Sequence, residues 1–158
     1  MLIRKDYYPE FKSGINQNQG IYQMAIIDWE QSYSVGVVEL DNHHKQLINM
    51  INELYFAMSN DRGQKVVDDI IRDMLDYAKM HFKIEEKYMR QCEYLGSLQH
   101  FREHERFVEK AQEMAQRCDA GEFVLSFEVI QFLSDWLKCH ILETDMKYAP
   151  LLKEKGLR

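Results

Sequence analysis

Two pairs of residues in this chain have the spacing that lets side chains from one helix chelate a metal ion. His81 and Glu85 stand four residues apart, and so do His100 and His104. In a helix, residues four apart point from the same face. Imidazole and carboxylate groups are costly to bury without a partner. If these faces are buried, a metal ion is the partner that they favour.

The segments that carry these residues repeat apolar side chains with the helical period of three to four residues. Gly96 and Gly121 follow the second and third segments, where helices commonly end. We expect Pro150 to limit the last helical segment, because proline disrupts the helix interior. The periodicity predicts four helices, at about 41–58, 67–89, 100–118 and 127–140.

Long helices joined by short loops pack antiparallel with their neighbours. The sequence therefore predicts an all-α fold, an antiparallel up-down-up-down four-helix bundle. The start of the first helix then lies level with the end of the second, the start of the third and the end of the fourth. Five of the six histidines should converge at that end of the core: His44, His81, His100, His104 and His140.

The ligand types narrow the choice of metal. Imidazole with carboxylate suits iron, zinc or copper, and the absence of thiolate disfavours a closed structural zinc site. Five imidazoles exceed the usual protein ligand set of one ion, so we expect two metals bridged by carboxylates, with Glu85 as one bridge. Glu143 and Asp145 are both candidates for the other. Ideal geometry favours Glu143, three residues after His140, whereas Asp145 would require the helix to deform or end near residues 142–144.

Composition limits the other possibilities. The chain has 158 residues, 46% of them hydrophobic, which suits one domain with a substantial core. Its net charge of −6 argues against binding to nucleic acid or to anionic lipid. No membrane span or signal peptide is recognisable, and the three scattered cysteines suit reduced thiols, so we expect a soluble cytoplasmic protein.

The first 22 residues lack sustained periodicity and include the polar stretch NQNQG at 16–20. We interpret residues 1–22 as an N-terminal arm or linker and residues 23–158 as the bundle domain. We expect a monomer, with the arm as a possible contact for a partner protein.

The chemistry-bearing residues lie in motifs that closely resemble those of the bacterial hemerythrins. The resemblance covers the chain from Asp28 onward. It implies that His100, His104 and His140 hold one iron, that His44 and His81 hold the other, and that Glu85 and Asp145 bridge both. It thus selects Asp145 over Glu143. The motifs, which follow Trp29, are VGV at 35–37, LDNHHK at 40–45, HFKIEE at 81–86, HFREH at 100–104 and WLKCHILETD at 136–145.

One departure from the family pattern is His43, which stands where the family often has glutamine. His44 continues the apolar stripe of Leu47 and Ile51, whereas His43 does not. We therefore interpret His44 as the ligand, and His43 as either a solvated residue or one that lies behind the ligands.

A count of ligands suggests the function. Two six-coordinate irons offer twelve positions, of which five imidazoles, two bridging carboxylates and a bridging oxo or hydroxo group take eleven. One position stays open on the iron of His44 and His81, where a diatomic molecule could bind. We expect Leu137 and neighbouring aromatic residues such as Trp136 to restrict the access of water. The alternative is that Leu137, Trp136 and Phe82 only fill the core.

These features predict reversible binding of molecular oxygen, for transport, storage or sensing, and not catalysis. Oxidising di-iron enzymes carry a GluxxHis motif, which this chain lacks at the site. The alternative is a di-iron oxidoreductase that consumes peroxide or nitric oxide.

Overall fold

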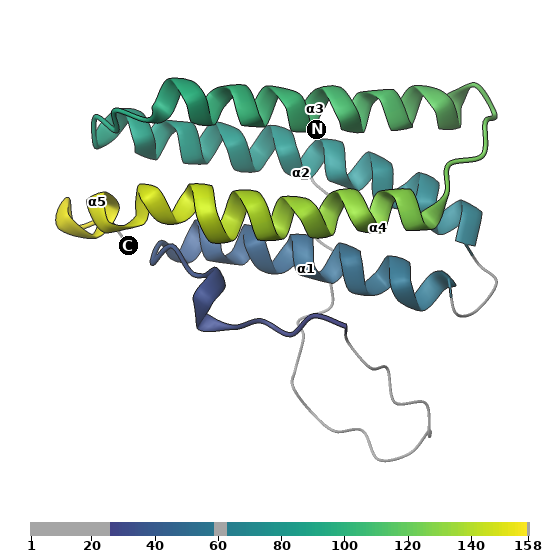
Figure 1. Ribbon diagram of the computed structural model, residues 1–158, viewed down its shortest axis with the longest axis horizontal. Coiled ribbons are helices and arrows are strands. Elements are labelled where there is room, and N and C mark those ends of the chain that lie inside the picture. The colour runs from purple at the N-terminus through teal and green to yellow at the C-terminus, as the bar shows by residue number, and fades with distance from the viewer. Residues whose placement is uncertain (1–25, 59–62, 158) are drawn as a thin grey trace, which may run out of the picture.

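The structure, a computed structural model, describes residues 26–58 and 63–157, in which all regular structure is helical. Helix α2 packs against both α1 and α3, and α1 also packs against α4, which confirms the antiparallel four-helix bundle (Figure 1). The predicted arm at 1–22 lies outside the described residues. The long helices are α1 (Val38–Met58), α2 (Gly63–Gln91), α3 (Ser97–Asp119) and a fourth composed of α4 (Ser126–Asp135) and the π-helix η2 (Trp136–Thr144).

The third helix ends where its glycine predicts. Gly121 has a φ of +75°, in the left-handed region that favours glycine. The N–H of Glu122 donates to the carbonyl of Arg117, and the N–H of Gly121 donates to that of Cys118, both at 2.9 Å. This pair of bonds is the Schellman arrangement, which satisfies carbonyls that a helix end would otherwise leave unpaired. The chain is thereby turned toward α4.

The end of the fourth helix differs from the expectation for Pro150. After η2 the backbone tightens into the 3₁₀ helix η3 (Asp145–Lys147) and then continues as α5 (Ala149–Glu154). Pro150 lies in the first turn of α5, so it begins a helix and does not limit the last one. The first turn tolerates proline because its N–H groups have no partner within the helix.

The segment before α1 is held against the bundle by side chains of that helix. Asn52 accepts hydrogen bonds from the N–H groups of Ile26 and Ile27 and donates one to the carbonyl of Ile27. Asp41 accepts bonds from the hydroxyl of Ser34 at 2.6 Å and from the N–H of Val35 at 2.8 Å. These contacts fix the short helix η1 (Gln31–Tyr33) beside the start of α1.

Two apolar clusters divide the core along its length. The larger cluster fills most of the bundle and includes Leu47, Phe107 and Leu133. The smaller one lies toward the α2–α3 turn and includes Leu40 and Tyr148. Along α1 the histidines at 43 and 44 fall between Leu40 and Leu47, so buried polar residues occupy the level between the two clusters.

Candidate metal centre

The seven predicted ligand residues meet in the interior between the two apolar clusters. Each of them is at most 2% exposed, which is rare for ionisable side chains unless they are paired or bind metal. They fall into two groups that could each hold a metal ion. One group is Glu85, His100, His104 and His140, and the other is His44, His81 and Asp145.

Glu85 of α2 faces imidazoles of both groups through one carboxylate oxygen. Its Oε2 lies 2.9 Å from Nε2 of His104 and 3.5 Å from Nε2 of His100, in its own group. The same oxygen lies 3.7 Å from Nε2 of His81, in the other group. Its second oxygen accepts a hydrogen bond from the hydroxyl of Tyr148. Glu85 therefore lies between the two candidate metal positions.

Asp145 faces the two groups with different oxygens. Its Oδ1 lies 3.2 Å from Nε2 of His140 and 3.4 Å from Nε2 of His100. Its Oδ2 lies 3.5 Å from Nε2 of His44. A carboxylate that directs one oxygen to each of two metal positions has the geometry of a bridge.

The π-helix η2 explains how Asp145 reaches the interior. The N–H of Asp145 donates to the carbonyl of His140, five residues earlier. In an α-helix this hydrogen bond would reach back only four residues. His140 and Asp145 consequently share one face, whereas Glu143 is exposed. The deformation expected near residues 142–144 is present, and it begins at Trp136.

The loop before α1 orients His44. Its Nδ1 lies 2.9 Å from the carbonyl oxygen of Tyr33, so the ring donates its N–H to the backbone there. A neutral imidazole with its proton on Nδ1 has a free lone pair on Nε2, which faces Asp145. Asp41 of α1 binds the next two residues, Ser34 and Val35, so α1 also fixes the position of the Tyr33 carbonyl.

Glu86 of α2 and Glu103 of α3 orient two of the three histidines of the other group in the same way. Glu86 Oε1 lies 3.3 Å from Nδ1 of His104, and Glu103 Oε2 lies 2.9 Å from Nδ1 of His140. A carboxylate that accepts the Nδ1 proton fixes the tautomer and makes Nε2 a better metal donor. The motifs HFKIEE and HFREH contain both glutamates, although their partners could not be read from the sequence.

His43 is buried, so the interpretation of His43 as a solvated residue is wrong. Only 7% of it is exposed, and its Nδ1 lies 3.4 Å from Nδ1 of His81. The two rings meet nearly at right angles. His43 therefore lies beside Nδ1 of His81, whereas Glu85 faces Nε2 of the same ring.

Burial favours the uncharged forms of His140, His81 and Asp145. It lowers the pKa of His140 to about 2, and it lowers the pKa of His81 well below the ordinary value. Burial, together with the charge of Glu85, raises the pKa of Asp145 well above its usual range. Neutral imidazoles have the lone pairs that metals require, and a cation would relieve the repulsion between the carboxylates.

The donor atoms themselves fit a pair of metal ions. Among the described residues, Nε2 of each of the five histidines has no hydrogen-bond partner, and neither do Oε2 of Glu85 and both carboxylate oxygens of Asp145. Buried polar atoms are almost always hydrogen-bonded, so eight such atoms facing one another require another explanation. Imidazole nitrogen and carboxylate oxygen are the donors that non-haem iron accepts.

Aromatic rings enclose the site. Phe82 stacks on His104 with ring centroids 3.9 Å apart, and Trp136 stacks on His140 at 3.8 Å. These two rings thus contact histidines of the site, and Leu137 is buried in the larger apolar cluster. Tyr148 was not predicted, because nothing in its spacing indicated that its hydroxyl reaches Glu85.

The family model for the hemerythrin HHE cation binding domain matches residues 35–152, most of the chain. The chain belongs to the hemerythrin family. A bacteriohemerythrin of Stenotrophomonas maltophilia is 33% identical over 82% of this chain and 84% of that protein. A hemerythrin-like protein of Naegleria gruberi is 33% identical over 79% of this chain and 92% of that protein. A solved structure of wild-type hemerythrin superposes with a TM-score of 0.73, at 28% identity, over 81% of this chain and 98% of the other.

Family membership confirms the resemblance drawn from the motifs. The hemerythrin domain binds a di-iron centre, and this chain has a cluster able to hold metal ions, so the predicted cofactor is supported by both findings. In the described parts of this hemerythrin, no helix combines the length and apolar character needed to cross a membrane.

Proposed function

We propose that this hemerythrin binds molecular oxygen reversibly at a carboxylate-bridged di-iron centre. In this proposal His100, His104 and His140 hold one iron and His44 and His81 hold the other. Glu85 and Asp145 bridge them. The observation that carries the proposal is the set of buried donor atoms without hydrogen-bond partners. Three of the imidazoles fall in one group and two in the other, and the two carboxylates lie between the groups. The relatives named bacteriohemerythrin support it.

The unequal division of the imidazoles is what leaves room for a guest molecule. With two bridging carboxylates and one bridging oxygen, the iron held by His100, His104 and His140 would have six ligands, and the iron held by His44 and His81 would have five. Bound iron would supply the electrons and the sixth position that oxygen needs. The protein supplies the neutral imidazoles, the orientation of each Nε2 and the apolar surroundings that keep bulk water out.

The donor set favours binding over oxidative turnover. Five neutral imidazoles and two carboxylates give iron less negative charge than the carboxylate-rich sites of oxidising di-iron enzymes. Both carboxylates are fully buried, and Tyr148 holds one oxygen of Glu85. Iron held by this donor set would stay in the ferrous state when no oxygen is bound.

The decisive experiment is iron analysis with optical spectra. The chain is reconstituted anaerobically with ferrous iron, and spectra are recorded before oxygen, after oxygen and after evacuation. We expect two irons per chain and a colour that appears with oxygen and disappears when oxygen is removed. The Glu143→Ala variant, which alters an exposed acid next to the site in sequence, is the control and should behave as the unaltered chain does.

Turnover assays distinguish the carrier from an enzyme. Peroxide or nitric oxide is added to the iron-loaded chain together with a reductant. Rapid catalytic consumption without a stable oxygen complex would reject the proposal in favour of an oxidoreductase. Failure to retain iron after reconstitution would reject both.

A further inference from the structure

Tyr77 is a buried tyrosine whose ring has an evident role and whose hydroxyl has none. It lies on α2, one turn before His81, and its ring is nearly parallel to the His81 ring, with centroids 5.1 Å apart and planes 18° apart. Only 4% of the residue is exposed. A phenylalanine would fill the same space and make the same stacking contact, so packing does not account for the hydroxyl.

The hydroxyl of Tyr77 has no hydrogen-bond partner within residues 26–58 and 63–157. Two other tyrosines do have one: Tyr148 donates to Glu85, and Tyr88 donates to Glu39 at 3.1 Å. A buried donor without an acceptor is unfavourable and rare. Its place beside the candidate metal centre points to an acceptor that enters the site.

The hydroxyl of Tyr77 is a donor at neutral pH. An ordinary phenol releases its proton only at about pH 10, so no special environment is needed for it to donate. Because Tyr77 touches His81, it lies on the side of the two-histidine iron, where the ligand count leaves a position open.

We propose that the Tyr77 hydroxyl is a hydrogen-bond donor to small guest molecules that bind beside His81, and that it favours guests whose outer atom accepts a hydrogen bond. The inference rests on the proposed function, because it requires a guest at the two-histidine iron. The guests are oxygen itself and small linear anions such as azide. In this proposal Tyr77 affects which guest molecules bind and how long they stay bound, whereas the histidines and carboxylates hold the metal.

The test compares Tyr77→Phe with the unaltered full chain, both loaded with iron. Azide is titrated into the oxidised proteins and followed by absorbance, iron content is measured, and thermal unfolding is recorded on the metal-free proteins. Loss of one hydrogen bond to a charged guest should raise the azide dissociation constant about tenfold to a hundredfold. The rate at which the oxygen complex loses colour under vacuum should rise as well. Iron content should stay at two per chain.

The metal-free protein separates a guest-binding role from a structural one. Tyr77→Phe removes an unpaired buried hydroxyl, so its unfolding midpoint should equal or exceed that of the unaltered chain. Tyr88→Phe is the matched control, since it removes a tyrosine hydroxyl outside the metal centre; it should leave azide affinity unchanged.

The outcomes distinguish this inference from the function on which it rests. Equal azide affinity in Tyr77→Phe and the unaltered chain would overturn the role of Tyr77 while leaving oxygen binding intact. A lower unfolding midpoint or fewer than two irons in Tyr77→Phe would assign the hydroxyl a structural role and overturn it too. If the unaltered chain held two irons but bound neither azide nor oxygen, the proposed function itself would fail.

Discussion

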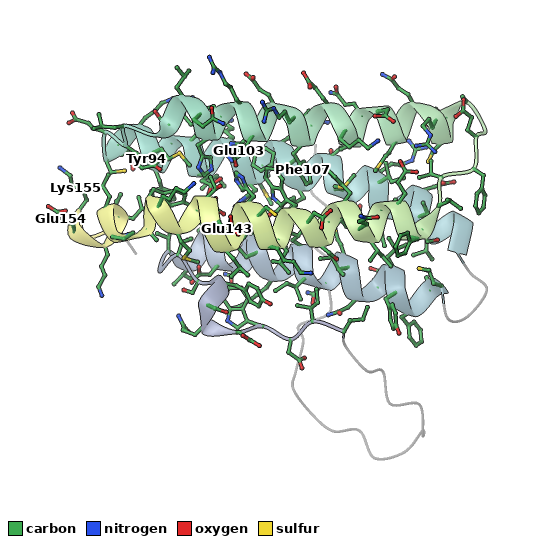
Figure 2. The ribbon with its side chains drawn as sticks, viewed as in Figure 1. Tyr94, Glu103, Phe107, Glu143, Glu154 and Lys155 are labelled. Atoms are coloured by element: carbon green, nitrogen blue, oxygen red, sulfur yellow. The ribbon has the colours of Figure 1, made fainter. Side chains whose placement is uncertain are left out.

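Glu103 of α3 and His140 of η2 are joined by a hydrogen bond, in which Oε2 of the carboxylate lies 2.9 Å from Nδ1 of the ring. Figure 2 shows Glu103 on the side of α3 that faces the fourth helix. The imidazole is 2% exposed and the carboxylate 26% exposed, so a partly solvated charge orients a buried imidazole of the candidate centre. Such partners of metal-binding histidines tune affinity without touching the metal.

Replacing Glu103 should weaken iron binding without abolishing it. Glu103→Ala removes the acceptor of the His140 proton, and we expect iron affinity to fall by about tenfold to a hundredfold. Competition with a ferrous chelator measures this change. Glu105→Ala is the control, because Glu105 lies on the same helix and is exposed. Equal affinities in the two variants would show that Glu103 does not support His140.

The two acidic residues after His140 should differ sharply in their effect on iron content. Asp145→Ala removes the carboxylate that faces both groups of imidazoles, and we expect the purified protein to hold at most one iron per chain. Glu143→Ala alters an exposed side chain and should retain two. Iron analysis after anaerobic reconstitution decides between them. The reverse result would mean that the π-turn of η2 does not exist in the loaded protein.

The neighbouring histidines of α1 and α2 give a second contrast. His81→Ala removes one of only two imidazoles at the proposed oxygen-binding iron, so the reversible colour change should be lost. His43→Ala removes a residue beside His81, with its Nδ1 3.4 Å away, and should retain oxygen binding with a weaker hold on iron. Spectra before and after oxygen test both variants. If His43→Ala lost oxygen binding while His81→Ala kept it, His43 and not His44 would be the iron ligand in α1.

Acid should destabilise the metal-free protein below about pH 6.5. Burial lowers the pKa of His140 from 6.5 to about 2, and it lowers the pKa values of His44 and His81 as well. From pH 6.5 downward the unfolded chain binds protons at these rings while the folded chain does not, so the unfolded state is favoured. Each ring contributes up to about 1.4 kcal/mol per pH unit. The contribution is complete above pH 6.5 and declines toward the folded pKa.

The raised pKa of Asp145 acts in the opposite direction, because the folded chain keeps a proton that the unfolded chain releases as pH rises above 3.8. Between pH 5.5 and 6.5 these three imidazoles, together with the lowered pKa of His43, outweigh Asp145 and the smaller upward shifts in the pKa values of Glu53 and Asp73. Urea unfolding of the metal-free protein at those two values should therefore show lower stability at pH 5.5. His140→Asn, which cannot titrate, should reduce the difference. Stability that rises toward pH 5.5 would contradict the buried neutral state of the histidines.

The sequence by itself determined the bundle and most of the candidate centre. Helical periodicity is a local property, so the positions of His81, Glu85, His100 and His104 on apolar stripes could be recognised without a fold. Short connections then required antiparallel packing, which brought the five histidines to one level. The glycine at 121 also ended its helix as predicted, because its conformational freedom is a property of that residue alone.

The tertiary structure decided what ideal helical geometry could not. Periodicity favoured Glu143, and only the family resemblance pointed to Asp145, because a π-turn depends on packing around η2 and not on local propensity. The partners of the imidazoles likewise come from other segments: Glu103 from α3, and the Tyr33 carbonyl from the loop that Asp41 holds. Distances between segments arise only when helices pack, which is why the unpaired hydroxyl of Tyr77 could not be read from its place on a stripe.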